Sequence, residues 1–420
     1  MKKLRNLVLI IGLLFGIYIV GINYDSIKIF ITDHIKLSEK KPIKNDNNDE
    51  KEPEELWPKE SKISLVATGD GLLHNAVYID AYDAENKTFD FSNQLTEVKD
   101  IISSYDIAYY NQETLFGGKL ENHFTASGAY QVKGYSSYPY FNSPSEFGDA
   151  MVDIGFNLIS LASNHSADCL SLSKTCIDNS YNYWASKDVV FDGFNNSEDK
   201  ENKYNINTIN GITYGFLNYT NTLNGLDGAL SGINYLVDTF DEETAKKEIS
   251  ELKEKVDVII VAMHWHKASA EYSTVPTNAN KELASFLSEQ GVDIILGTYS
   301  HCLQPFDIIN DKTVVFYSLG NFISNQGDLV SSIGYKGIVG ALASLDIIKT
   351  EYEDGTKEIK IDNIGAELIY TYNKNHKNYK VIPFSKMTEE YNPNYKDIYN
   401  EYSNVLTSLN NNIAIIPVNE

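Results

Sequence analysis

Cysteine is scarce in this 420-residue chain, which contains only Cys169, Cys176 and Cys302. Three scattered cysteines are too few for a disulfide framework or a thiolate zinc site. Cys169 and Cys176 could pair with each other, but the sequence alone does not fix their geometry. Cys302 follows a histidine and is more typical of a small buried hydrophobic residue than of a nucleophile.

Two well-known catalytic motifs are missing, and positive charge is limited. The chain has no Gly-x-Ser-x-Gly segment, so a serine hydrolase lacks support. It has no Gly-x-x-x-x-Gly-Lys-Ser/Thr loop, which argues against a P-loop ATPase. Lysine and arginine number 35 against 58 acidic residues, for a net charge of −23. Such a surface repels phosphates, so we expect no nucleic-acid partner and no attachment to an anionic leaflet by bulk charge.

Apolar content, in contrast, is ample. Hydrophobic residues make up 42% of the chain and aromatic residues 12%, including 29 tyrosines. This composition excludes a wholly disordered or fibrous protein. At about 150 residues per domain, the length is compatible with two to three domains, or with one large α/β domain that carries tails.

The N-terminal 61 residues predict a membrane anchor and a spacer. Lys2, Lys3 and Arg5 precede an apolar run from Leu7 to Ile22, and no convincing Ala-x-Ala cleavage site follows it. We therefore expect an uncleaved signal anchor over residues 1–25, with a cleaved signal peptide as the alternative. The positive-inside rule then predicts a single-pass protein of the cell membrane with most of its chain outside, and both readings export it. Residues 26–61 are charged and polar, and we interpret them as a flexible tether.

The remainder alternates short apolar runs with helix-like segments. This alternation predicts βαβ units and a largely parallel core sheet. Ser143 is expected to cap a helix that has Pro144 in its first turn, and two further helices are expected over 241–255 and 278–290, the latter closed by Gly291. An antiparallel pair is expected late in the chain. The expected strands are Ile63–Thr68, Ile107–Tyr110, Leu158–Leu161, Val258–Met263, Val292–Leu296 and Val314–Tyr317, followed by the pair 338–347 and 358–368.

Polar side chains follow these strands at their carboxyl ends. Because the carboxyl ends of parallel strands meet at one edge of a sheet, the side chains could gather in one site. Each has an ordinary alternative as a turn former, a cap or a satisfied core residue. Together they form an oxygen and nitrogen ligand set suited to Mn, Fe or Zn ions, and to two ions better than one. The set is Asp70, Glu113, Asn164, His165, His264 and His301.

Two other histidines have no such partner spacing. We interpret His74 and His123 as surface residues of loops. His266 lies two residues after His264, hence on the same strand face, and we favour His264 as the ligand.

In this order the segments resemble the CapA family of poly-γ-glutamate capsule proteins, whose domain is similar to the calcineurin-like metallophosphoesterases. The resemblance covers roughly residues 62–368. It implies a layered α/β/β/α domain over 62–370, and leaves 371–420 as a C-terminal extension of uncertain structure. The segments that carry it are Thr68-Gly69-Asp70, Asn111-Gln112-Glu113-Thr114, Ser163-Asn164-His165-Ser166-Ala167-Asp168, His264-Trp265, Gly297-Thr298 with His301, and Ser318-Leu319-Gly320-Asn321-Phe322.

The resemblance also implies roles for these residues. Asp70 and His301 would ligate one divalent ion, Asn164 and His264 a second, and Glu113 would bridge them. His165 would be the catalytic acid, which protonates a leaving oxygen or stabilises developing charge. The residues expected to support these ligands or contact substrate are Asn111, His266, Tyr299 and Asn321.

Two positions depart from the pattern. Leu72 stands where the phosphoesterases carry a histidine, and Tyr299 replaces another histidine with a poor ligand. Three functions therefore stay open. The chain could act in synthesis, export or attachment of poly-γ-glutamate, with the polymer or its membrane synthase and export subunits as partners. It could be a metal-dependent hydrolase of another envelope phosphoester or amide. It could also be a non-catalytic scaffold.

Overall fold

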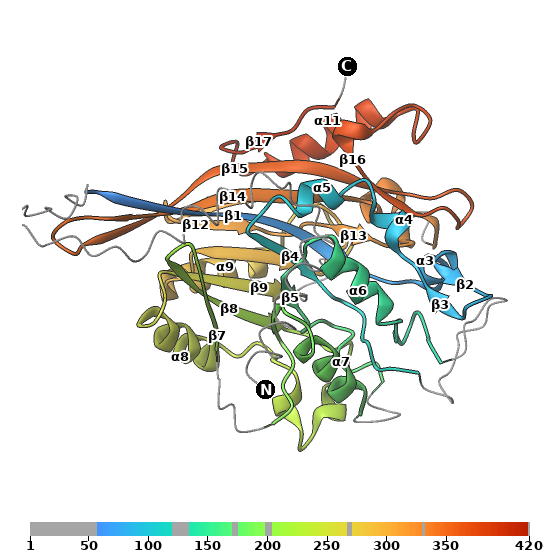
Figure 1. The fold of residues 1–420 in the computed structure, drawn as a ribbon, viewed down its shortest axis with the longest axis horizontal. Helices are drawn as coiled ribbons and strands as arrows, with labels where there is room; N and C mark the ends of the chain where they lie inside the picture. Colours follow the sequence, from blue (N-terminus) through green and yellow to red (C-terminus); the bar gives the residue numbers. More distant parts are fainter. Residues whose placement is uncertain are drawn as a thin grey trace, which may run out of the picture. The chain divides into compact units, whose positions relative to one another are not determined.

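Two β-sheets lie face to face in this protein (Figure 1). The computed structural model describes residues 57–119, 134–169, 175–197, 204–266, 271–329 and 332–418. The predicted anchor over 1–25 and the tether up to residue 56 lie outside the described residues, as does His123. Trp57–Glu420 forms one compact unit. No described helix is both long and apolar enough to cross a bilayer.

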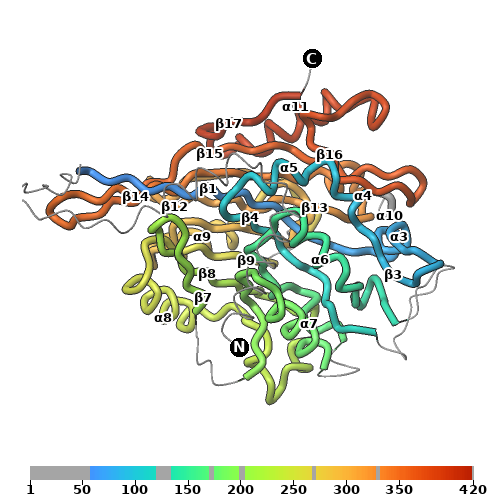
Figure 2. The backbone as a smooth tube through the Cα atoms, in the orientation of Figure 1, coloured from blue at the N-terminus to red at the C-terminus, as the bar shows by residue number. Residues whose placement is uncertain are grey.

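The larger sheet has nine strands in the order β16-β15-β14-β1-β4-β5-β6, with β13 beside β1 and β17 beside β15. Strand β1 therefore lies between β4 and β14, from distant parts of the chain (Figure 2). From β1 to β6 neighbours are parallel, whereas from β1 to β16 they are antiparallel. The strands are β1 (Lys59–Gly71), β4 (Ile107–Asn111), β5 (Leu158–Ser160), β6 (Val190–Asp192), β13 (Asn321–Ile323), β14 (Val339–Glu351), β15 (Lys357–Tyr372), β16 (Lys380–Pro383) and β17 (Ala414–Ile415).

The smaller sheet has six strands in the order β11-β12-β10-β9-β8-β7. Its four central strands are parallel and its two outer pairs antiparallel. The largely parallel core sheet expected from the alternation is thus found as two sheets, each with a parallel part, because strand spacing does not reveal which strands share a sheet. The strands are β7 (Asn205–Ile209), β8 (Ile212–Thr220), β9 (Val258–His264), β10 (Ile294–Thr298), β11 (Phe306–Ile309) and β12 (Thr313–Phe316), and a separate hairpin pairs β2 (Tyr82–Asp83) with β3 (Thr88–Phe89).

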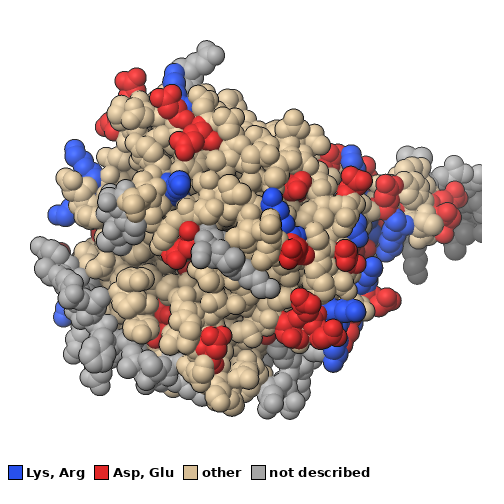
Figure 3. Space-filling model, turned by 180° about the vertical axis from the view of Figure 1, so that it is seen from behind, with Lys and Arg blue, Asp and Glu red and all other residues tan. Residues whose placement is uncertain are grey.

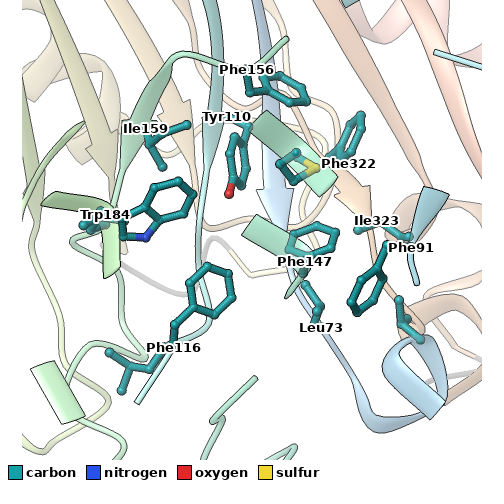
Figure 4. Packing of buried hydrophobic residues seen from close by; sticks show 14 of the residues in the cluster. Leu73, Phe91, Tyr110, Phe116, Phe147, Phe156, Ile159, Trp184, Phe322 and Ile323 are labelled. Atoms are coloured by element: carbon teal, nitrogen blue, oxygen red, sulfur yellow. The ribbon is translucent and has the colours of Figure 1, made fainter. Parts of the chain in front are cut away.

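Helices cover both outer faces, which gives the layered α/β/β/α arrangement that was predicted. One apolar cluster fills the space between the sheets, and two others lie under the helices on either side. In the cluster under the larger sheet's helices, Phe147 and Trp184 both pack their rings against Tyr110 (Figure 4). The helices are α3 (Asn75–Asp80), α4 (Ser92–Leu95), α5 (Lys99–Ile102), α6 (Glu146–Asp153) and α7 (Thr175–Ala185) over the larger sheet, α8 (Glu242–Lys253) and α9 (Asn278–Gln290) over the smaller, α10 (Gln326–Leu329), and α11 (Tyr395–Leu406).

Several local predictions are confirmed and one is wrong. Asp241 caps α8 by accepting a hydrogen bond from the N–H of Thr244, and Gly291 ends α9 in the left-handed conformation. The predicted antiparallel pair is β14 and β15. Helix α6, however, begins at Glu146 rather than after Ser143, whose hydroxyl instead donates to Oγ1 of Thr114. A cap residue must offer its oxygen to the first turn, and this one is engaged elsewhere.

The three cysteines form one disulfide and one free thiol, as the sequence allowed. Cys169 and Cys176 form a disulfide with their Cα atoms 6.1 Å apart. Cys302 is a buried free thiol, and burial raises its pKa to about 12, which makes it a poor nucleophile.

The chain beyond the expected boundary at residue 370 belongs to the same compact unit. Strand β15 runs across that boundary to Tyr372, and β16 pairs with it. Helix α11 contributes Ile398 and Tyr402 to the cluster between the sheets. It packs on the same face of the larger sheet as the six-stranded sheet does, and lies beside β15 in Figure 1.

Candidate metal centre

The strand ends bring the predicted ligands together from both sheets. Asp70 is near the end of β1, and Glu113 follows the adjacent parallel strand β4. In the other sheet, His264 ends β9, and His301 follows its parallel neighbour β10. The site therefore lies at the seam between the sheets, and its geometry depends on how the two sheets pack.

Glycine makes the close approach at Asp70 feasible. A Cβ atom on Gly69 would lie 1.7 Å from the carbonyl oxygen of Gly320, a distance that no side chain allows. The N–H of Asp70 donates to this same oxygen at 3.0 Å, and β1 pairs with β13 so that Asp70 lies opposite Asn321. Gly69 thus sets the register that brings these two side chains to the site.

Asp70, Glu113 and His301 form the centre of the site. Nδ1 of His301 is 3.3 Å from Oδ2 of Asp70 and 3.7 Å from Oε2 of Glu113. One ligand atom from each of the three residues lies within 4.8 Å of the others, and all three residues are buried. Two carboxylates and an imidazole are a donor set suited to Mn, Fe or Zn.

The carboxylate oxygens here fit a metal ion. Oδ2 of Asp70 and both oxygens of Glu113 are buried and have no hydrogen-bond partner among the described residues. Buried carboxylate oxygens without partners are costly, and a cation compensates them. The three residues could therefore hold a divalent ion.

The pKa values of Glu113 and His301 reflect the burial of these charged groups next to one another. Burial raises the pKa of Glu113 to about 8, although the charge of His301 opposes the rise. Burial lowers the pKa of His301, but Glu113 and Asp70 outweigh this effect and bring it to about 9. Without a cation the site thus retains protons, which a bound metal would displace.

Asn321 presents an oxygen to this centre. Its Nδ2 donates to Ser324 Oγ, Gln326 Oε1 and the carbonyl of Gly337 at 3.0, 2.8 and 2.8 Å. With the amide nitrogen fully engaged, Oδ1 faces His301, 3.2 Å from its Nδ1. The structure therefore places Asn321 beside the ligands, where the sequence predicted a supporting role.

His264 and Asn164 lie at the same site but bind each other. Nε2 of His264 is 2.9 Å from Oδ1 of Asn164 and 4.0 Å from Oε1 of Glu113. On its other side, Nδ1 lies 2.9 Å from Oγ1 of Thr298 and 3.3 Å from Nδ2 of Asn111. Burial lowers the pKa of His264 to about 3, so the ring is neutral. Both of its nitrogens are engaged, in contrast to the unpartnered oxygens of the centre.

Asn111 connects these groups. Its Nδ2 donates to Oδ1 of Asp70 at 2.7 Å, and its Oδ1 accepts from the hydroxyl of Ser160 at 2.7 Å. The hydroxyl of Ser160 in turn contacts the hydroxyl of Tyr109 at 2.8 Å. This chain fixes the orientation of the Asp70 carboxylate and leaves its Oδ2 directed at His301.

His165 lies beside the centre and is held by an acid. Its Nδ1 is 2.7 Å from Oδ2 of Asp168, which also accepts a hydrogen bond from the N–H of Phe141. Its Nε2 is 3.9 Å from Oε1 of Glu113. Burial lowers the pKa of His165, but Asp168 and Glu113 outweigh it and raise the pKa above its usual value. Asp168 was not among the predicted site residues, although it lies three positions after His165.

Tyr299 and His266 pack against the ligands. The ring of Tyr299 lies 4.7 Å from the ring of His266 and 5.4 Å from that of His264. Burial raises the pKa of the Tyr299 phenol above its usual value, so it stays protonated at neutral pH and does not replace an anionic or imidazole ligand. Tyr299 and His301 both have positive φ angles, 93° and 58°, an uncommon conformation that marks this loop as constrained.

The prediction that His74 is a surface residue is wrong. Its side chain is 4% exposed, and it lines the same cleft as His165 and His301. His74 follows the end of β1, and Asp70 lies near that end. This shared position was the sequence signal that could have placed His74 at the site. The interpretation failed because His74 precedes a short helix and has no ligand spacing to another histidine.

A cleft of about 270 Å³ opens above the centre. Aromatic and neutral polar side chains form most of its wall. Leu72, which stands where the phosphoesterases carry a histidine, also lines the cleft. Its lining is Leu72, His74, Tyr138, Pro139, Tyr140, Phe141, Asn164, His165, Asp168, Asn224, Leu226, Glu271, Tyr272, Tyr299, His301 and Gln326.

The fold and the site together define a class: a two-sheet α/β protein with a buried carboxylate–imidazole cluster at its strand ends and a cleft above it. Residues 64–326 match the family described as "Bacterial capsule synthesis protein PGA_cap". Because this match covers more than half of the chain, the chain belongs to that family. All five members of the predicted ligand set and His165 lie within the matched region.

Curated relatives agree with this membership. The chain is 29% identical over 241 residues to the "PGA biosynthesis protein CapA" of Bacillus subtilis, which covers 56% of this chain and 60% of that protein. It is 26% identical over 240 residues to the "Capsule biosynthesis protein CapA" of Bacillus anthracis, covering 55% of this chain and 56% of that protein. The matched part thus spans somewhat over half the length of these relatives.

Solved structures give a weaker likeness. The calcineurin-like phosphoesterase YfkN from Bacillus subtilis is 16% identical, with 72% of this chain and 91% of that chain covered at a TM-score of 0.39. A putative 5'-nucleotidase from Staphylococcus aureus is 12% identical, with 81% and 58% covered at a TM-score of 0.39. These scores are too low to carry an argument, so the fold description depends on the sheets and layers alone.

Proposed function

We propose that this protein acts in the synthesis, export or attachment of poly-γ-glutamate capsule, through a divalent ion held by Asp70, Glu113 and His301. Family membership and the names of the two Bacillus relatives support the capsule role. One observation carries the involvement of the centre: three buried carboxylate oxygens without partners lie next to His301, at the base of an open cleft.

The negative charge of both the polymer and this chain explains why binding of the polymer would need a local cation. Poly-γ-glutamate is a polyanion, and this chain has a net charge of −23. On the face seen in Figure 3, acidic and basic side chains are interspersed among neutral ones. Such a surface offers little long-range attraction to a polyanion, and salt screens what remains. A cation at the base of the cleft would supply the attraction where the polymer has to be held.

The chain's own residues would give this ion its setting. Bound there, Mn, Zn or Fe acts as a Lewis acid toward a carboxyl or phosphoryl oxygen. Asn111 holds the Asp70 carboxylate in place, and Asn321 adds an amide oxygen beside His301. His165, oriented by Asp168, is positioned to hold or donate a proton at Nε2.

The unpartnered oxygens favour one ion over the two that the sequence suggested. His264 and Asn164, the predicted ligands of a second ion, are hydrogen-bonded to each other. A second ion would have to break this contact and disturb a buried, neutral imidazole whose two nitrogens are already hydrogen-bonded. We therefore place one ion at the centre and assign Asn164 and His264 to its support.

Location outside the cell membrane is part of the proposal. The basic and apolar N-terminal segment predicts a single-pass anchor with the rest of the chain outside. The Cys169–Cys176 disulfide is compatible with an oxidising compartment. Membrane subunits that synthesise or export the polymer would then be the natural partners.

Complementation of a deletion strain tests the proposal. The gene is deleted in the organism that encodes it, and surface polymer is measured after return of wild-type, Asp70→Asn or Lys62→Met protein. Lys62 forms an exposed ion pair with Asp346 far from the cleft, which makes Lys62→Met a matched control. We expect polymer to return with the wild type and the control but not with Asp70→Asn, at equal protein levels. Normal polymer in the deletion strain would refute the capsule role.

A metal-dependent hydrolase of another envelope substrate is the second candidate. The placement of His165 beside the centre favours it, because a protonated imidazole there could serve a leaving group. Metal-loaded protein would then hydrolyse a generic phosphodiester or a γ-glutamyl oligomer, and His165→Ala would abolish turnover. A scaffold role, which Leu72 and Tyr299 suggest, predicts instead that Asp70→Asn restores capsule fully.

A further inference from the structure

The cleft has to bind an anion without the usual cationic side chains. The chain contains a single arginine, Arg5, which lies in the predicted anchor. None of the described residues that line the cleft is a lysine. Neither a guanidinium fork nor an ammonium group is therefore available there. Apart from the cleft histidines His165 and His301, whose pKa values are raised, an anion in this cleft depends on a bound ion and on neutral hydrogen-bond donors.

His74 is such a donor, and the structure fixes which nitrogen carries its proton. The N–H of Asn325 donates to Nδ1 of His74 at 3.3 Å. Because Nδ1 accepts, a neutral ring carries its hydrogen on Nε2. Asn325 is itself held, since its Oδ1 accepts from the hydroxyl of Tyr379 at 2.6 Å and lies 3.2 Å from Nδ1 of His376.

These supports come from outside the part that matches the family. Tyr379 and His376 lie beyond residue 326, in the segment expected to be a C-terminal extension. Asp80, in the helix that follows His74, accepts hydrogen bonds from the N–H groups of Asn378 and Tyr379. The C-terminal segment thus contacts Asp80 directly and His74 through Asn325.

The other nitrogen is the one assigned to a ligand. His74 lines the cleft, and the hydrogen-bond contacts described for its ring are the one from the N–H of Asn325 to Nδ1 and one with the backbone carbonyl of Leu72. Its ring meets Phe141 edge-on at 5.4 Å, and Phe141 meets His165 at 4.7 Å, so His74 and His165 flank one aromatic ring. Burial lowers the pKa of His74 to about 3, and the positive charge of His301 adds to the effect, so the ring stays neutral.

We propose that His74 is a substrate-contacting residue whose Nε2–H donates a hydrogen bond to an anionic oxygen, of a carboxylate or a phosphate, on the molecule bound in the cleft. The inference rests on the proposed function for the idea that this cleft receives an anionic substrate. It goes beyond that function by assigning recognition to a neutral imidazole that is not a metal ligand. A neutral donor would bind either anion without adding charge to a site in which Asp70, Glu113 and His301 would hold a cation.

Two amide substitutions distinguish the role of Nδ1 from the role of Nε2. In His74→Asn the shorter amide can accept from Asn325 as Nδ1 does, but it places no donor where Nε2 was. In His74→Gln the longer amide can place an N–H near the position of Nε2, but it gives up the contact with Asn325. If His74 had only a structural role, His74→Gln would weaken anion binding more than His74→Asn. If His74 donates to the anion, His74→Asn weakens binding more.

Calorimetric titration of the full-length protein loaded with Mn²⁺ tests this. The two probes are inorganic phosphate and a short γ-glutamyl oligomer, and metal content is measured for each variant. We expect the wild type to bind at least one probe, and the tighter one identifies the class of anion. Because a hydrogen bond to a charged group is at stake, His74→Asn should weaken binding about tenfold, and His74→Gln by less than about threefold. Metal content should stay equal in all three proteins.

Three results would overturn the assignment. These are binding of neither probe by wild type, binding by His74→Asn as tight as by wild type, and impairment of His74→Gln as great as that of His74→Asn. Failure of the capsule role is recognised separately, by normal surface polymer in the deletion strain, and failure of the metal centre by Asp70→Asn restoring the polymer. In either case, weakened binding by His74→Asn would still support the hydrogen bond from His74.

Discussion

Asp70 and His301 belong to different β-sheets, yet Oδ2 of Asp70 lies 3.3 Å from Nδ1 of His301. Asp70 reaches this point from β1 of the larger sheet, and His301 from the loop after β10 of the smaller one. The apolar cluster between the sheets therefore positions the candidate ligands as well as stabilising the fold. An ion bound between them would in turn join the two sheets.

Binding of Mn²⁺ should stabilise the folded protein through Glu113. An ion that binds the native state alone adds about 2.7 kcal/mol to the free energy of unfolding at a concentration 100 times its Kd. We expect urea unfolding to show this gain for wild type and to show none for Glu113→Gln, which removes an anionic ligand. Glu248→Gln is the matched control, since Glu248 is also buried but lies in α8, bonded to Tyr219. Equal gains for Glu113→Gln and wild type would contradict the assignment.

Lys349 should contribute more to stability than a surface lysine does. Its side chain is buried, and Nζ donates to Asp257 at 3.0 Å and to the carbonyl of Gly211 at 2.8 Å. Lys349→Met leaves these acceptors without their partner, at a cost of about 2–3 kcal/mol in the free energy of unfolding. Lys62→Met removes an exposed ion pair with Asp346 and should cost less than about 1 kcal/mol. Chemical denaturation of both variants measures the difference, and equal costs would contradict the prediction.

Asp293 should make stability fall between about pH 4 and pH 6. Burial raises its pKa from 3.8 to about 6, although the N–H of Ile259 and nearby lysines oppose the rise. Because the folded state holds the proton more tightly than the unfolded chain, stability is greatest below the unfolded pKa and declines until pH passes the folded one. The loss is at most about 2–3 kcal/mol. In Asp293→Asn the amide oxygen can still accept from Ile259, and this component should disappear.

Unfolding experiments at pH 4, 5, 6 and 7 check the Asp293 prediction. The informative quantity is the difference in free energy between wild type and Asp293→Asn at each pH, since other groups titrate in both proteins. That difference should shift in favour of the variant as the pH rises. A difference independent of pH would show that Asp293 has an ordinary pKa.

Thiol counting should distinguish the three cysteines. In denaturant, one thiol per chain should react before reduction and three after it, because Cys169 and Cys176 are paired and Cys302 is free. In the folded protein Cys302 should react slowly, since it is buried and its pKa is raised. Three reactive thiols in unreduced protein from the native host would contradict the disulfide, and would weaken the proposed location outside the membrane.

The sequence was sufficient to predict which polar side chains gather at the strand ends, but not how they bond to one another there. Asp70, Glu113, Asn164, His264 and His301 could be found because each follows a buried strand, and strand ends converge in this type of fold. Which of them remain free for an ion could not be predicted, since the contact between His264 and Asn164 depends on side-chain geometry across the two sheets. Asp168 and His74 were missed although each had a positional signal: Asp168 lies three positions after His165, and His74 follows the end of β1.

The division into two sheets followed from the family resemblance and not from the hydrophobic pattern. Strands β4, β9 and β10 are buried throughout and β1 is buried in its second half, so periodicity does not show which of them form another sheet. The helix over 278–290 was predictable because Gly291 provides a local stop signal. Helix α11 was not, because its segment is rich in tyrosine and asparagine and its apolar face shows only when packed against β15.

Metal analysis of purified full-length protein tests the central claim most directly. Wild type is reconstituted with Mn²⁺, Zn²⁺ or Fe²⁺ in turn, freed of unbound ion, and measured beside Asp70→Asn, Glu113→Gln and the control Glu248→Gln. The account predicts about one tightly held ion per chain in wild type and in the control, with most of it lost in the two ligand variants. Wild-type protein that retains no ion, or ligand variants that retain as much as wild type, would contradict it.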